Sequence, residues 1–244
     1  MNLKDYLSIT PEIQEALAAG KPVVAVVTCG RPLLLDWFDK NASAVLCAWF
    51  AGTEAGHALA DLLTGDANPS GKLSVTFPRS MGQIPIYYNH MNTGRPWNGV
   101  SDEKFVSRYL DGPNTPLYPF GHGLSYSSFR IKEAALSSGE MAADGALTVR
   151  VRVQNDSDVA GTAVLQMYLH DVSARIARPV KELKGFARVD LAPGEEKEVC
   201  LPITPDLLRF HDGREWLLEP GRFVVMLGFS SADDQLEKLE FSLV

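Results

Sequence analysis

Lys72-Leu73-Ser74-Val75-Thr76-Phe77-Pro78-Arg79-Ser80 is the stretch that separates two halves of different character in this chain of 244 residues. A turn is predicted just before it, at Asn68-Pro69-Ser70-Gly71, because proline fixes φ and glycine permits positive φ. A short β-branched and aromatic run follows the turn, and Pro78 and Pro85 prevent that run from continuing as a strand. The pattern predicts a strand over 72–77 that ends one domain and begins an extended crossing to the next.

The residues before this stretch alternate between helix and strand signals. The runs at 23–27 and 44–49 are continuously apolar, which is typical of parallel strands covered by helices on both faces. The predicted order is helix 10–20, strand 23–27, helix 33–38, strand 44–49, helix 52–65 and strand 72–77. This alternation predicts a doubly wound α/β domain over residues 1–86. Three strands leave an apolar sheet edge bare, so we expect an incomplete domain that self-associates or binds another chain there.

After Pro85 the chain changes character twice. Residues 87–128 are too rich in aromatic residues for a flexible linker, so we expect an ordered connector that its prolines hold extended. From about residue 129 the apolar period becomes two, as in 147–153, so that one face of each strand is core and the other is solvent. Turn signals separate seven or eight such runs. Residues 129–244 are therefore predicted to form an immunoglobulin-like β-sandwich.

Charge and composition indicate which classes of binding partner, compartment and metal site to expect. A formal net charge of −7 and a pI near 5.3 argue against nucleic acid or an anionic membrane as the partner. No apolar run is long enough to span a bilayer, and residues 1–6 lack the apolar core of a signal peptide, so the sequence assigns no compartment. Cys29, Cys47 and Cys200 lack metal-ligand spacing and are predicted to be buried free thiols. No metal or cofactor is expected.

Three motifs stand out: WFAGTEAG at 49–56, GDANPSGKL at 65–73 and LYPFGHGLSY at 117–126. Shorter pieces accompany them in order at 20–24, 30–32, 76–80, 82–85, 92–96, 178–186 and 191–195. Together they resemble the C-terminal half of a family 3 glycoside hydrolase, a β-glucosidase of the bacterial periplasmic type, over nearly the whole chain. The resemblance implies part of an (α/β)₆-type sandwich domain for residues 1–86 and a fibronectin type III-like domain for residues 129–244.

The resemblance also implies a chemistry. Enzymes of the family carry a nucleophilic Asp on a barrel and an acid/base Glu on a loop of the α/β domain. A retaining glycosidase needs these two carboxyl groups about 5–5.5 Å apart. Both positions fall before Met1, so the resemblance implies a C-terminal region that acts on a β-glucoside or oligosaccharide only with a barrel, which a separate chain could supply. The alternative is a non-catalytic module, derived from a glycosidase, that binds carbohydrate or protein.

The candidate substrate-cleft residues follow from the strand ends, because ligands of doubly wound folds bind beyond the carboxyl ends of the strands. Glu54 is either a site carboxylate or a first-turn residue favoured by the helix dipole. Trp49 and Phe50 could stack on a sugar ring, but core burial is at least as good an explanation for Trp49. Arg31 and Arg95 could bind sugar hydroxyls or a carboxylate, or form packing salt bridges. No catalytic residue is assigned within the chain.

Overall fold

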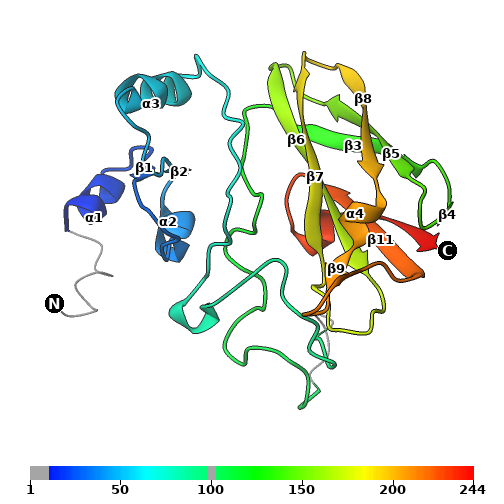
Figure 1. The fold of residues 1–244 in the computed structure, drawn as a ribbon. Helices are drawn as coiled ribbons and strands as arrows, with labels where there is room; N and C mark the ends of the chain where they lie inside the picture. Colours follow the sequence, from blue (N-terminus) through cyan, green and yellow to red (C-terminus); the bar gives the residue numbers. More distant parts are fainter. Residues whose placement is uncertain (1–10, 98–102) are drawn as a thin grey trace.

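The computed structural model describes residues 11–97 and 103–244, and places an α/β part and a β-sandwich on either side of the connector (Figure 1). The α/β part contains α1 (Pro11–Ala18), β1 (Val24–Val27), α2 (Asp36–Asn41), β2 (Ala44–Cys47) and α3 (Ala55–Thr64). Strands β1 and β2 pair in parallel, with Val24 opposite Ala44 and Val27 opposite Cys47. The predicted α/β fold with parallel strands is confirmed. The predicted cap at Thr10 lies outside the described residues.

Three local predictions in this part were wrong. The two strands are shorter than expected, and β1 is not buried on both faces, since Val24 and Val26 are 43% and 40% exposed. The helix after β1 begins at Asp36 rather than Leu33, because Leu35 is buried in a small core with Phe77 and Leu117. The chain stays non-helical up to Leu35 so that the Leu35 side chain can reach this core.

The third error concerns the stretch at 72–77, which does not form a strand. It lies beside residues 117–122 of the connector, and the two share an isolated bridge between Phe77 and Tyr118 and single bonds such as Leu73 N–H to the His122 carbonyl, 2.8 Å. Between these contacts the Phe120 carbonyl accepts a hydrogen bond from the Ser231 N–H at 2.9 Å, so it faces the sandwich and the two segments do not form a regular ladder. The segment is an extended crossing that pairs with the connector.

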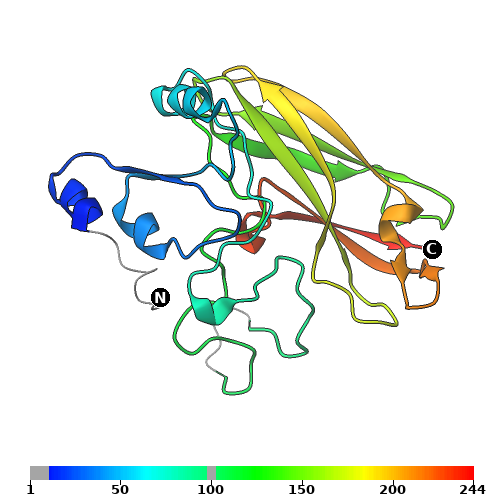
Figure 2. The same cartoon turned by 60° about the vertical axis from the view of Figure 1, so that its left-hand side comes forward.

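Two antiparallel-rich sheets form the sandwich, as Figure 2 shows from the side. One sheet has the order β4-β12-β11-β6-β7 and the other the order β3-β5-β8, while β9 and β10 form a separate ribbon. The predicted fibronectin type III-like sandwich is confirmed. The remaining elements are η2 (Met81–Gln83), β3 (Phe129–Leu136), β4 (Glu140–Met141), β5 (Leu147–Asn155), β6 (Gly161–Asp171), β7 (Glu182–Leu191), β8 (Glu196–Ile203), α4 (Pro205–Leu208), β9 (Phe210–His211), β10 (Trp216–Leu217), β11 (Gly221–Gly228), η3 (Asp233–Gln235) and β12 (Glu237–Leu243).

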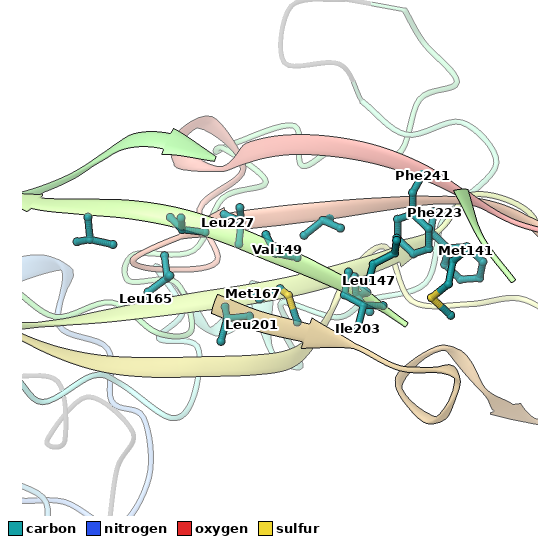
Figure 3. Packing of buried hydrophobic residues seen from close by; sticks show 14 of the residues in the cluster. Met141, Leu147, Val149, Leu165, Met167, Leu201, Ile203, Phe223, Leu227 and Phe241 are labelled. Atoms are coloured by element: carbon teal, nitrogen blue, oxygen red, sulfur yellow. The ribbon is translucent and has the colours of Figure 1, made fainter. Parts of the chain in front are cut away.

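The sandwich core lies between these sheets (Figure 3). Strand β5 alternates as its sequence predicts, since Val149, Val151 and Val153 are fully buried while Arg150 and Arg152 face solvent. Phe223 and Phe241, on neighbouring strands, stack with their ring centroids 5.4 Å apart. Burial of such side chains supplies most of the driving force for folding, and the sandwich holds the larger of the two described cores.

The connector joins the two parts through packed and hydrogen-bonded contacts. Tyr88 stacks on Phe120, with ring centroids 4.3 Å apart, and contacts Tyr168 of β6 edge to face. The Gln166 amide, buried in β6, donates to the carbonyls of Gly121 and Phe229 at 3.1 and 2.9 Å. The connector is therefore an ordered layer that packs against the sandwich.

Candidate ligand site at the carboxyl ends of β1 and β2

Two loops meet where the parallel strands β1 and β2 end. One follows β1 and carries Gly30 and Arg31, and the other follows β2 and carries Trp49 and Phe50. The Phe50 ring lies over Gly30 so closely that a Cβ atom on Gly30 would stand 3.0 Å from the ring carbon Cε2. The absence of a side chain at residue 30 therefore allows the two loops to touch.

Trp49 and Phe50 have opposite surroundings. The Trp49 indole is half-buried and packs against the fully buried Phe77 ring, with centroids 5.9 Å apart. The Phe50 ring is 79% exposed. Trp49 has a φ of 48°, a left-handed conformation that a residue with a large side chain adopts rarely. Of the two alternatives for Trp49, packing is the one its surroundings support, while Phe50 is the aromatic ring that is open to a ligand.

Glu54 occupies the N-cap position of α3, but its side chain makes no capping hydrogen bond. Its Oε2 atom lies 2.6 Å from His57 Nδ1, one turn along the helix, and both side chains are exposed. An exposed pair of this kind contributes little to stability. His57 was not among the predicted site residues, although its i, i+3 spacing from Glu54 could have indicated the contact.

The two arginines lie in different places. Arg31 is exposed in the loop beside Phe50, and no ion pair joins it to another side chain in 11–97 or 103–244. Arg95 lies in the connector, where its carbonyl accepts a hydrogen bond from the Ser107 N–H at 2.9 Å. Its side chain lines an open hollow with Pro96, Glu103, Lys104, Phe105 and Val106. The structure therefore places Arg31, Trp49, Phe50 and Glu54 on two adjacent loops, and no hydrogen bond or ion pair described for residues 11–97 and 103–244 connects Arg95 to them.

The three thiols are free, but their burial differs from the prediction. Cys29 is buried, Cys47 is half-buried and Cys200 is exposed on the outer face of β8. Burial raises the pKa of the Cys47 thiol, and the neighbouring Cys29 adds to the effect. The prediction that all three are buried was wrong for Cys200, because edge strand β8 turns this residue to solvent.

Behind the loops, side chains of the connector hold α2. The Tyr118 hydroxyl donates to Asp39 Oδ1 at 2.7 Å, and the Tyr118 ring stacks on His122 with centroids 5.2 Å apart. Burial, followed by the nearby Lys72 ammonium, lowers the pKa of the His122 imidazole, and Asp39 opposes this shift. The folded protein therefore favours neutral His122.

This arrangement predicts that stability falls on acidification. Above a pH of about 6.5, His122 is neutral in both states. As the pH falls below that value, the unfolded chain takes up a proton that the folded chain resists, so the free energy of unfolding decreases. Urea denaturation at pH 7.5 and 5.5 should show a smaller decrease for His122→Phe, which keeps the stacked ring, than for the unaltered chain. Equal decreases would contradict the assignment.

Neither a metal centre nor a membrane helix is found in the described part of the chain. Within 11–97 and 103–244, no three His, Cys, Asp or Glu side chains gather where they could hold a metal ion. No helix among these residues is long and apolar enough to cross a membrane.

Comparison with known proteins shows which protein family the chain belongs to. Residues 10–126 match the glycosyl hydrolase family 3 C-terminal domain, and residues 163–231 match the fibronectin type III-like domain. The chain belongs to glycosyl hydrolase family 3. The proposed domain boundaries, after residues 86 and 128, stay a prediction within this family assignment.

The relatives of this family 3 chain include both β-glucosidases and β-xylosidases. It is 52% identical to the periplasmic β-glucosidase of Salmonella typhimurium over 88% of its own length and 28% of that protein. It is 38% identical to a β-xylosidase of Formosa agariphila over 98% of its length and 32% of that protein. The crystal structure of a Listeria innocua β-glucosidase with glucose superposes with a TM-score of 0.89 at 46% identity, over 96% of this chain and 33% of that one. The chain thus spans about a third of the length of its relatives and matches their C-terminal part.

Proposed function

We propose that this chain acts as the C-terminal part of a family 3 β-glucosidase, which hydrolyses terminal β-D-glucosyl residues with retention. The observation that carries the proposal is the superposition of 96% of the chain on a β-glucosidase that was solved with glucose bound. The 52% identity to a periplasmic β-glucosidase favours a glucoside over a xyloside, because the matched β-xylosidase is 38% identical.

We further propose that the two reacting carboxyl groups come from outside these 244 residues. The family resemblance puts the nucleophilic Asp on a barrel and the acid/base Glu ahead of the position that matches Thr10. The carboxylate at the strand ends, Glu54, has His57 as its partner rather than a second carboxylate. A retaining mechanism needs two carboxyl groups at close range. The chain alone is therefore expected to be inactive.

The role left to this chain is to complete and support the substrate site. The exposed Phe50 ring, the Arg31 guanidinium and the Glu54 carboxylate could meet a sugar from the carboxyl ends of β1 and β2. The α/β sheet supports the same idea, because Val24 and Val26 leave one face of β1 open. We propose that the rest of the α/β domain covers this face, supplied by the same polypeptide, by a separate chain that carries the barrel, or by a second copy of this chain.

A fusion enzyme tests the proposal. The part of the Salmonella typhimurium β-glucosidase that precedes its aligned region would be joined to this chain, and release of the aryl group from an aryl β-glucoside would be measured. We expect activity in the fusion and none above a mock purification in the isolated chain. The matched control is the same fusion with the barrel's nucleophilic Asp replaced by Asn, which should be inactive.

Two results would contradict the proposal. One is a folded fusion, shown by circular dichroism and a cooperative thermal transition, that hydrolyses no β-glucoside. The other is hydrolysis by the isolated chain that survives repurification and is lost in Glu54→Gln, because the chain would then carry its own acid.

A further inference from the structure

The Phe50 ring is held in place although most of it faces solvent. It is 79% exposed, whereas the ring of the preceding residue, Trp49, packs against the fully buried Phe77. Its inner side rests on Gly30, where an added Cβ would approach ring carbons Cε2 and Cζ to 3.0 and 3.3 Å. A large aromatic side chain that is supported from behind and open in front presents one flat face to a ligand.

The backbone at Trp49 explains why neighbouring rings point in opposite directions. The left-handed φ of 48° turns the chain immediately after β2, so that Trp49 packs inward and Phe50 points outward. Such a conformation persists only where the surroundings hold it, and it is enriched at functional sites. Here the support is Phe77, which is fully buried and fixed by backbone bonds to Tyr118 and Leu117, each 2.9 Å long.

The two loops that meet at this ring also carry polar groups. Arg31 follows Gly30 directly, and Glu54, paired with His57, begins the helix after the Phe50 loop. An apolar surface with a few hydrogen-bonding groups on the same loops is the usual composition of a site for a small molecule. A pyranose ring offers the matching surface, because it has an apolar face of C–H groups and hydroxyl groups around its rim.

We propose that Phe50 binds the leaving-group ring of the β-glucoside, and that Gly30, Trp49 and Phe77 are positioning residues that hold Phe50 there. This inference rests on the proposed function. The leaving-group side is favoured because the loop that carries Phe50 contains no second carboxylate to act on the glucosyl carbon. Phe50 would therefore decide which leaving groups the enzyme accepts, rather than the rate of bond cleavage.

The test compares two substrates of the fusion enzyme. Cellobiose has a sugar ring as its leaving group, and methyl β-D-glucopyranoside has only a methyl group. We expect Phe50→Ala to raise the KM for cellobiose roughly tenfold, the loss of about one good ring contact, with little change in kcat and no change in the KM for the methyl glycoside. Phe77→Leu should shift the cellobiose KM in the same direction by less. Phe186→Ala, which alters a 64% exposed ring on β7, is the matched control and should change neither value.

Other outcomes would overturn the inference while leaving the proposed function intact. Unchanged KM values for both substrates in Phe50→Ala would exclude ring binding. An equal rise for both substrates together with a lower melting temperature would assign Phe50 to the contact with the barrel.

A second measurement uses the 244-residue chain itself and does not depend on activity. In protein labelled with 5-fluorotryptophan, cellobiose should shift the ¹⁹F resonance of Trp49, which Trp49→Phe identifies, and Phe50→Ala should remove the response. No shift at saturating cellobiose, or a shift that persists in Phe50→Ala, would contradict the inference. An inactive fusion with a ¹⁹F response would instead refute the proposed function and keep the binding site.

Discussion

Replacing Gly123 with alanine is expected to lower the free energy of unfolding by about 3 kcal/mol, near the upper end for an overpacked position. A Cβ at this residue would stand 2.2 Å from the Gly71 carbonyl oxygen and 3.1 Å from Lys72 Cδ. The carbonyl belongs to backbone, so it cannot rotate away as a side chain could. The Lys72 ammonium also binds the Gly123 carbonyl, which holds the two segments together. The substitution would therefore separate the connector from residues 71–73.

Urea denaturation followed by circular dichroism measures this effect. The matched control is Gly139→Ala, because nothing lies within 4 Å of the position that its Cβ would take. The control should stay within about 0.5 kcal/mol of the unaltered chain, as surface substitutions usually do. Equal stabilities of the two variants would show that the connector does not pack against residues 71–73 as the structure has it.

Asn68→Ala is expected to lower the free energy of unfolding by a similar amount, about 3 kcal/mol. The variant loses four hydrogen bonds of about 1 kcal/mol each, and their partners are left partly buried. The Asn68 amide donates to Ser127 Oγ and to the Ala160 carbonyl, both at 2.8 Å. Its carbonyl oxygen accepts from Ser125 Oγ at 2.8 Å and from the Tyr126 N–H at 2.9 Å. One side chain in the turn after α3 thus ties the α/β part to the end of the connector and to the loop before β6.

A control variant separates this loss of stability from a general effect of removing an asparagine. Asn41→Ala removes an exposed amide whose one described bond goes to the Trp37 carbonyl at 2.7 Å, and it should cost well under half as much. Differential scanning calorimetry should also show a broader transition for Asn68→Ala, because the two parts of the molecule would unfold less cooperatively. A sharp transition with the stability of the Asn41 variant would contradict the role given to Asn68.

Some of the candidate site could be predicted from the sequence. Continuous apolar strands favoured a parallel sheet, and parallel strands end at one edge, so the loops that carry Arg31 and Phe50 were expected to lie together. The sequence left the roles of Trp49 and Phe50 open, because both are aromatic and adjacent. The left-handed backbone of Trp49 separates them, and residue type does not predict that conformation at a tryptophan. Arg95 was grouped with these residues on chemistry alone, and it lies in the connector.

The sequence by itself determined the features that depend on local order. The two-residue period of 147–153 becomes strand β5 with its valines buried, and the apolar runs at 23–27 and 44–49 become the parallel strands β1 and β2. These patterns are local because the alternation or continuous apolarity of each strand lies within its own few residues.

Only the tertiary structure decided the contacts between distant residues. Residues 72–77 do not form a strand because the Phe120 carbonyl of their partner segment binds Ser231 of the sandwich, and the Asn68 amide reaches residues 59 and 92 positions further along the chain. The outward position of Phe50 depends on Gly30 and Phe77, which lie on other segments. Such contacts form when the chain is folded, and a one-dimensional pattern does not contain the distances that decide them.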